Sequence, residues 1–243
     1  MTPVATPTPS AATLDGFVAT PLTPRCAQVA DRARHVCLGI SPFNGYYTQP
    51  RIDLLVRWGL EAYPSVSFYV PDLSPQHTFR ALGYAEGKAR TKARRQGAYV
   101  LNKIRTALGK AGVADPEPYL QWSEPLDANE QYQRLAREGR ERFADDAAFR
   151  AATLETSRWV LAGKIPDGGE PTAEQAELAV EYFLDELPFF VDTPAIVGEG
   201  PSVFVYHQPV DYLARLYRHE LSLLPSEDQG FLVLSTPEPQ PED

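Results

Sequence analysis

The stretch HVCLGISPFNG, residues 35–45, decides the fold of this chain. Its first part, HVCLGIS (35–41), is a short apolar run with the β-branched residues Val36 and Ile40, and a Pro-Asn-Gly turn region follows it. This pattern predicts a buried strand. Ser41 would close that strand at one edge of a sheet.

Strand-like and helix-like segments alternate beyond this first strand. Further strands are predicted at 66–72, 119–124, 202–208 and 230–236. Helical spacing of apolar residues predicts helices at 51–63, 86–111, 128–163 (one or two helices) and 172–187, the last of them ending at Leu187 and Pro188. The alternation predicts a single α/β domain with a mainly parallel sheet flanked by helices. Ligands of such sheets bind beyond the carboxyl ends of the strands, where Ser41, Asp72 and His207 would share one rim.

The two ends of the chain differ from its body. Residues 1–25 are rich in Thr, Pro and Ala and lack apolar periodicity, which predicts a disordered arm. Residues 237–243, PEPQPED, also lack apolar periodicity and are rich in Pro, which predicts a disordered tail. The predicted folded domain is therefore 26–236.

Composition and absent motifs exclude several classes of protein. No apolar run approaches the roughly 20 residues of a membrane span, and the N-terminus does not resemble a secretory signal. Cys26 and Cys37 form neither a disulfide framework nor a zinc spacing, so a cytoplasmic location is expected. The chain has no phosphate-binding loop, no dinucleotide fingerprint and no ATP-binding signature of the H-I-G-H or K-M-S-K-S type. We therefore expect no ATP and no metal as cofactors.

Charge is distributed unevenly along the chain. Residues 86–110 carry eight Lys or Arg and one Glu, a local charge of +7, whereas the whole chain carries -9, so the remaining residues carry -16. A solvated helix face is the usual explanation of a charge run, but such faces normally mix both signs. One basic segment on an acidic body indicates one anionic partner, such as RNA phosphates. The candidate contacts are Lys88, Arg90, Lys92, Arg94, Arg95, Lys103 and Arg105.

Ser41 is a candidate nucleophile at a strand end. A hydroxyl needs a base or an already activated ester to react, and the ordinary alternative is a turn residue before Pro42. The hydrolase elbow G-x-S-x-G is not met, because Phe43 stands where the second glycine should be.

Two further segments carry candidate groups. In YFLDELPFF (182–190), Tyr182 and Glu186 are one helical turn apart among apolar residues, so Glu186 is either a surface carboxylate or a part-buried one that needs a cationic partner. In VFVYHQP (203–209), Tyr206 and His207 would face opposite sides of a regular strand. A Ser41–His207–Asp triad is conceivable, but the spacing does not demand it.

Together these segments resemble the cyclodipeptide synthases, from about His35 to Thr236. The likeness rests on LGISPFN with Ser41 and Asn44, on Tyr182-x-x-x-Glu186-x-Pro188 and on Tyr206-His207, in this order, and it indicates the family branch marked by Asn, Tyr and His. The resemblance implies a Rossmann-like fold similar to the catalytic domains of class I tyrosyl- and tryptophanyl-tRNA synthetases. It also implies two aminoacyl-tRNAs as substrates, bound through the basic segment.

The resemblance assigns a role to each matched residue. Ser41 would take the first aminoacyl group from its tRNA, and Glu186 with Tyr182 would hold the α-ammonium of that group. The second aminoacyl-tRNA would supply an amine that attacks the Ser41 ester, while Tyr206 relays a proton as the dipeptidyl enzyme cyclises. The supporting residues would be Gly39, Asn44, Tyr132 and His207. The first aminoacyl pocket would be lined by Cys37, Gly39, Phe68, Phe189 and Phe204.

Three phenylalanines in that pocket leave little volume, so the first amino acid is expected to be small, such as alanine. The Pro42-Phe43 pair and Gly45 depart from the family pattern. Beyond its two tRNA substrates the protein is expected to be a monomer without DNA or membrane partners, followed by tailoring enzymes that modify its product.

Two rival functions stay open at this stage. One is an esterase or acyltransferase that uses Ser41 and His207 on a small ester and does not need the basic helix. The other is a non-catalytic tRNA-binding module, which does not need Ser41.

Overall fold

Six strands form one sheet in the computed structural model, which describes residues 16–165 and 169–236. The sheet order is β1-β6-β5-β2-β3-β4, and all neighbouring pairs are parallel except β1 with β6. The strands are β1 (Val18–Pro21), β2 (His35–Gly39), β3 (Ser65–Tyr69), β4 (Leu120–Gln121), β5 (Ser202–Tyr206) and β6 (Gln229–Ser235). The parallel part reverses its order between β2 and β5, which is the doubly wound arrangement of a Rossmann-like domain. The predicted mainly parallel sheet is confirmed.

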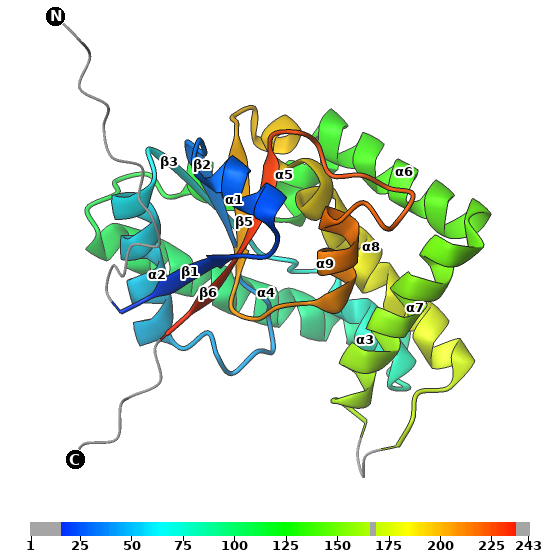
Figure 1. Ribbon diagram of the computed structural model, residues 1–243. Helices are drawn as coiled ribbons and strands as arrows, with labels where there is room; N and C mark the ends of the chain where they lie inside the picture. The colour runs from blue at the N-terminus through cyan, green and yellow to red at the C-terminus, as the bar shows by residue number, and fades with distance from the viewer. Residues whose placement is uncertain (1–15, 166–168, 237–243) are drawn as a thin grey trace, which may run out of the picture.

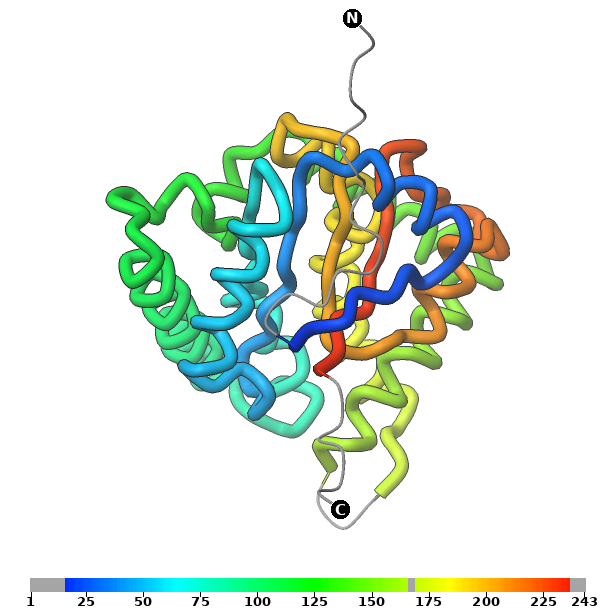
Figure 2. The backbone as a smooth tube through the Cα atoms, turned by 60° about the vertical axis from the view of Figure 1, so that its left-hand side comes forward, coloured from blue at the N-terminus to red at the C-terminus, as the bar shows by residue number. Residues whose placement is uncertain are grey.

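Alternation along the strands assigns each side chain to one of two helical layers (Figure 1). Val36 and Leu38 of β2 pack with α2 (Gln49–Ala62) and α4 (Glu86–Lys110), whereas Cys37 packs with α8 (Ala173–Val197) and its neighbours on the other face. Figure 2 shows the two layers on either side of the strands. The other helices are α1 (Pro24–Ala30), α3 (Pro75–Ala81), η1 (Glu117–Tyr119), α5 (Ser123–Asp127), α6 (Glu130–Asp145), α7 (Ala147–Ala162) and α9 (Asp211–Tyr217). No helix within the described residues is long and apolar enough to cross a membrane.

The predicted disordered arm is wrong for its last part. Residues 18–21 form β1, which pairs with β6, and the Phe17 side chain is fully buried. Thr23 then caps α1 by accepting from the Cys26 amide, and Pro24 takes the first helical position. The Thr-Pro pair that resembles a linker in the sequence is thus a helix start. Residues 1–15 and the tail, 237–243, lie outside the described residues.

The predicted strand at 119–124 is also mostly wrong. Only Leu120 and Gln121 pair with β3. The residues before them form a 3-10 turn. The residues after them begin α5, where the Asp72 carboxylate accepts a hydrogen bond from the Ser123 amide. The segment 128–163 forms two helices, α6 and α7, with Asp146 as the N-cap between them.

Helix α8 does not end at Pro188 but runs to Val197. It contains Pro188 and Pro194 and has one non-helical residue, Asp192. Pro194 leaves the Phe190 carbonyl without its helical donor, and the Tyr217 hydroxyl donates to that carbonyl at 2.8 Å. α8 is therefore two helical segments joined by a kink at Asp192, and the Tyr217 hydroxyl binds a carbonyl beside that kink.

Gly97 is the point where α4 contacts the end of β3. A Cβ atom there would lie 2.3 Å from Asp72 Cβ and 2.7 Å from Asp72 Cα, and backbone cannot move aside as a flexible side chain can. We expect Gly97→Ala to lower the free energy of unfolding by about 2–4 kcal/mol, measured by urea denaturation. Gly109→Ala on the same helix meets nothing within 4 Å and should stabilise by up to about 1 kcal/mol. Equal stability of the two variants would contradict this packing.

Candidate active site

The carboxyl ends of β2 and β5 meet at the point where the strand order reverses, and Ser41 and Tyr206 come together there. Ser41 follows β2 by two residues and Tyr206 is the last residue of β5. The Ser41 Oγ and Tyr206 Oη atoms are 3.2 Å apart. Both side chains line a cleft of about 840 Å³, together with Tyr182 and Glu186 of α8. The sequence-predicted Ser41, Tyr182, Glu186 and Tyr206 thus share one cavity at the expected rim of the sheet.

Glu186 is the only carboxylate among these four groups, and it lacks a cation. Burial, reinforced by the negative charge of Asp185 and opposed by a hydrogen bond from Tyr182, raises the pKa of Glu186 to about 8. The Tyr182 hydroxyl also hydrogen-bonds with Ser41, and burial keeps the pKa of Tyr182 well above its ordinary value. Within the described residues no Lys, Arg or His forms an ion pair with Glu186. A cationic ligand group placed here would stabilise the ionised carboxylate.

His207 supports this site through Asn44 rather than through Ser41. The Asn44 Oδ1 atom accepts from the Tyr46 amide, so its Nδ2 group must donate to His207 Nε2 at 2.8 Å. The proton of the neutral imidazole then lies on Nδ1. Burial lowers the pKa of His207, which agrees with a neutral acceptor.

The expectation that Tyr206 and His207 face opposite sides is wrong, because β5 ends at Tyr206. Their rings stack instead, with centroids 4.4 Å apart. Asp72 does not complete a triad either, since its carboxylate accepts from the Ser123 amide and hydroxyl, both at 2.9 Å. The geometry therefore argues against a Ser-His-Asp esterase.

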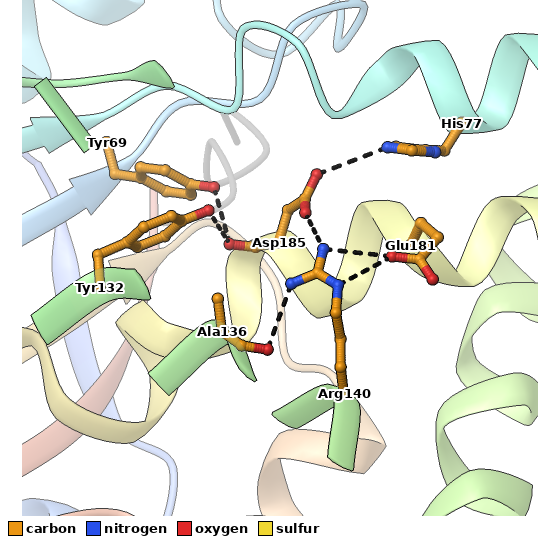
Figure 3. A network of polar contacts seen from close by, with 7 residues as sticks. All are labelled: Tyr69, His77, Tyr132, Ala136, Arg140, Glu181 and Asp185. Carbon is orange, nitrogen blue, oxygen red and sulfur yellow. Dashed lines mark hydrogen bonds and ion pairs between the residues drawn. The ribbon is translucent and has the colours of Figure 1, made fainter. Parts of the chain in front are cut away.

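The turn of α8 that carries Glu186 is anchored from behind (Figure 3). The hydroxyls of Tyr132 and Tyr69 donate to the Asp185 carbonyl at 3.0 and 3.5 Å. Arg140 of α6 binds the Asp185 carboxylate at 2.6 Å and also pairs with Glu181 at 3.2 Å. This network fixes the helix and balances the charge next to Glu186.

The family resemblance indicates Tyr132 as a site residue, but the sequence analysis does not identify Asp185 and Arg140, which belong to the same network. Arg140 and Asp185 lie in charged helical stretches where nothing distinguishes them from surface residues. The position of Asp185 directly before Glu186 was the one available signal.

One predicted pocket residue, Phe68, lies on the wrong face of the sheet. In β3 it packs with Leu38 against α2 and α4, and its neighbour Tyr69 faces α8 instead. Side chains alternate along a strand, so an error of one residue changes the face. Tyr69 stacks on Phe189 with centroids 4.0 Å apart.

The remaining pocket residues lie together beneath the cleft. Cys37, Phe189 and Phe204 are buried in the same apolar cluster as Tyr69. Phe204 contacts Gly39 so closely that a Cβ atom on this glycine would lie 2.6 Å from its ring. Aromatic rings therefore fill the space beside Gly39.

The basic segment forms α4, as predicted, but its charges are not equivalent. Arg105 is bound to Glu117 at 2.6 Å, and Lys103 donates to the Tyr47 carbonyl at 2.9 Å. Lys92 lies 4.6 Å from the ring centres of Phe79 and Tyr84. Four other predicted residues are exposed and have no ion pair with any residue in the described parts of the chain: Lys88, Arg90, Arg94 and Arg95. These four offer free positive charge to an anion.

Comparisons with known proteins agree with this geometry. The family model described as "Cyclodipeptide synthase" matches residues 17–236. A cyclo(L-leucyl-L-leucyl) synthase of Bacillus subtilis is 32% identical over 90% of this chain and 89% of its own length. A cyclo(L-tyrosyl-L-tyrosyl) synthase of Mycobacterium tuberculosis is 30% identical over 96% of this chain and 80% of its own. A solved Mycobacterium tuberculosis structure, which relates cyclodipeptide synthetases to type I tRNA synthetases, superposes with a TM-score of 0.81 at 30% identity, covering 97% of this chain and 99% of that one.

Proposed function

The chain belongs to the cyclodipeptide synthase family, and on that premise we propose that it takes two aminoacyl groups from two aminoacyl-tRNAs and joins them through an ester on Ser41. The observation that carries the proposal is the single cleft in which Ser41, Tyr182, Glu186 and Tyr206 converge. A nucleophilic hydroxyl beside a carboxylate suits an ester with a free ammonium group.

In the first step the Ser41 hydroxyl attacks the ester carbonyl of an aminoacyl-tRNA. The new ester forms on Ser41 Oγ, and the ribose oxygen of the tRNA leaves with the proton. One ester replaces another, so the step needs no ATP. The Tyr206 hydroxyl, 3.2 Å from Ser41 Oγ, would pass the proton in this proposal.

Glu186 and Tyr182 bind the α-ammonium of the aminoacyl group in this scheme. The ammonium supplies the cation that Glu186 lacks, and its charge would lower the carboxyl pKa from about 8.

Two further bond changes complete the product. The amine of the Ser41-bound residue attacks the ester of the second aminoacyl-tRNA, which releases that tRNA and leaves a dipeptidyl ester on Ser41. This direction corrects the expectation from the resemblance, because attack by the amine of the second aminoacyl-tRNA on the Ser41 ester would free Ser41 and leave the dipeptide on the tRNA. The amine of the second residue then attacks the Ser41 ester, closes the six-membered ring and frees Ser41. Tyr206 would return the proton to Ser41 Oγ in this last step.

The first amino acid is small in this proposal. Tyr69, Phe189 and Phe204 are almost fully buried and pack against one another beside Gly39, which leaves little room below Ser41. The correction from Phe68 to Tyr69 keeps three aromatic rings there and therefore keeps the expectation of a small residue such as alanine.

Expression of the full chain in a bacterial host, with mass analysis of the medium, tests the proposed activity. We expect a new cyclic dipeptide that the host with an empty vector does not make. Soluble protein without any cyclic dipeptide would contradict the function. A main product made of Phe, Tyr or Trp alone would contradict the small first pocket and leave the function standing.

Neutralising the free cations of α4 tests the tRNA dependence. We expect the variant with glutamine at Lys88, Arg90, Arg94 and Arg95 to bind tRNA at least about tenfold more weakly at physiological salt. The salt dependence of binding should also become shallower, because fewer phosphate counterions are released. Affinity measured across a salt series gives both values.

A charge-matched control removes four cations that are already ion-paired elsewhere on the surface. They are Arg32, Arg134, Arg150 and Arg215, paired with Asp228, Glu138, Glu177 and Glu155. Exposed pairs contribute little to stability, so the control should fold. If both variants lost the same affinity, net charge rather than the α4 face would explain the binding.

A further inference from the structure

Exposed aromatic rings lie along the basic helix and in the cleft that contains Ser41. Four aromatic side chains are more than a third exposed within the described residues, namely Phe43, Tyr84, Tyr99 and Trp159. Phe43 and Trp159 line the cleft, and Tyr84 and Tyr99 each lie about 4.5 Å from a lysine of α4. Solvent exposure of a large ring costs free energy unless a ligand covers it.

Three of the rings near Ser41 form a continuous path. The Phe43 ring meets the Phe79 ring edge to face at 4.7 Å between centroids, and Phe79 meets Tyr84 at 5.5 Å. Phe43 and Phe79 line the same cleft as Ser41. At the far end, Lys92 of α4 lies over both Phe79 and Tyr84, and its ammonium is 3.2 Å from the Tyr84 hydroxyl. The path therefore leads from α4 to the cleft that contains the nucleophile.

The loop that carries Phe43 is held in a defined shape. Phe43 has a φ of 61°, the left-handed region that a bulky residue rarely adopts. Asn44 binds the Tyr46 amide, the Tyr47 hydroxyl binds the Gly39 carbonyl, and Lys103 binds the Tyr47 carbonyl. These bonds fix the direction of the Phe43 ring, which is 37% exposed two residues after Ser41.

We propose that Phe43 and Tyr84, supported from beneath by Phe79 and flanked by Lys92, are a stacking track for the single-stranded 3′ end of the aminoacyl-tRNA between α4 and Ser41. The inference rests on the proposed function and adds the route by which the ester reaches the nucleophile. A cleft of about 840 Å³ has the size of a small-molecule site, which suits a few unpaired nucleotides. Bases stack on exposed aromatic faces regardless of sequence, while nearby cations contact the phosphates.

Phe79 is the positioning residue of the track, since only 8% of it is exposed and it touches both outer rings. Phe43 and Tyr84 are the rings that bases would contact. Lys92 is held over the track by its two ring contacts, so its charge lies beside the strand rather than in open solvent.

The test measures binding of two probes to the full-length protein: an intact uncharged tRNA, and the same tRNA lacking its single-stranded 3′-terminal nucleotides. We expect removal of these nucleotides to weaken binding to the wild type about tenfold or more. Phe43→Leu and Tyr84→Leu keep apolar bulk but lose the ring face, so each should weaken binding of the intact tRNA about five- to tenfold and leave the truncated tRNA unaffected. Tyr84→Phe should restore binding.

Tyr99→Leu is the matched control, because Tyr99 is an exposed tyrosine beside a lysine on α4 but outside the track. It should weaken the two probes to the same extent, if at all. Loss of intact and truncated binding in equal measure by Phe43→Leu and Tyr84→Leu would overturn the track, while the proposed function stands. A wild type that binds neither probe would overturn both.

Discussion

Replacing Ser41 by alanine is expected to remove the cyclic dipeptide from the culture medium, with a fall of at least about 10³-fold in product. The reason is chemical, because without Oγ no covalent aminoacyl or dipeptidyl ester can form. The substitution removes one atom from a half-buried side chain that hydrogen-bonds only to groups of the cleft, Tyr206 and Tyr182, within the described residues, so the fold should persist. Mass analysis of the medium and of the intact protein measures both the product and the ester.

The mass of the intact protein distinguishes a covalent mechanism through Ser41 from direct reaction between two bound aminoacyl-tRNAs. Wild-type protein mixed with one aminoacyl-tRNA should gain the mass of one aminoacyl group, and Ser41→Ala should gain none. Ser41→Cys is a useful companion, since a thiol can take the acyl group as a thioester. Product formation by Ser41→Ala at the wild-type rate would exclude the ester and favour direct reaction between two bound tRNAs.

The sequence predicted the site better than it predicted the chain around it. Ser41, Tyr182, Glu186 and Tyr206 line one cleft, as the family resemblance implies. Strand ends and helical spacing alone leave each of these residues an ordinary structural alternative, and the order of the three motifs is what selects them together.

The errors arose where distant segments decide local structure. Residues 18–21 become a strand because β6 pairs with them. α8 passes Pro188 and kinks at Asp192 before Pro194, and Tyr217 of a distant helix binds the Phe190 carbonyl beside that kink. The exchange of Phe68 for Tyr69 shows a different weakness. When a pocket residue is assigned one position too early in a strand, its side chain lies on the opposite face of the sheet.

Arg140 illustrates what the sequence alone could not reveal. It lies in an Arg- and Glu-rich amphipathic helix, where every charged residue is an equally good candidate for solvent exposure. Only the packing of α6 on α8 shows that its guanidinium binds Asp185 beside Glu186.

Replacing Glu186 by glutamine is expected to lower the rate of Ser41 acylation at low substrate by about 10²–10³-fold. The amide keeps the shape and the neutral state of the protonated carboxyl but cannot pair with the α-ammonium, and an uncompensated charge in a part-buried site costs about 3–5 kcal/mol. Single-turnover acylation, followed by intact mass, measures this step without the later amine attack. Glu177→Gln on the exposed side of α8 is the matched control and should stay within about twofold of the wild type.

The stability of Glu186→Gln distinguishes a lost contact from a damaged fold. The pKa of Glu186 is raised from 4.5 to about 8 in the folded state, so the unfolded chain ionises first as the pH rises. The wild type therefore loses stability between about pH 4.5 and pH 8, and glutamine, which does not titrate, avoids this loss. Solvent in the open cleft screens part of the effect, so we expect the variant to gain about 2–4 kcal/mol relative to the wild type on going from pH 5 to pH 8. A variant that is inactive but gains nothing with pH would show that Glu186 is ionised in the empty site and that its need for a ligand cation is smaller than its burial implies.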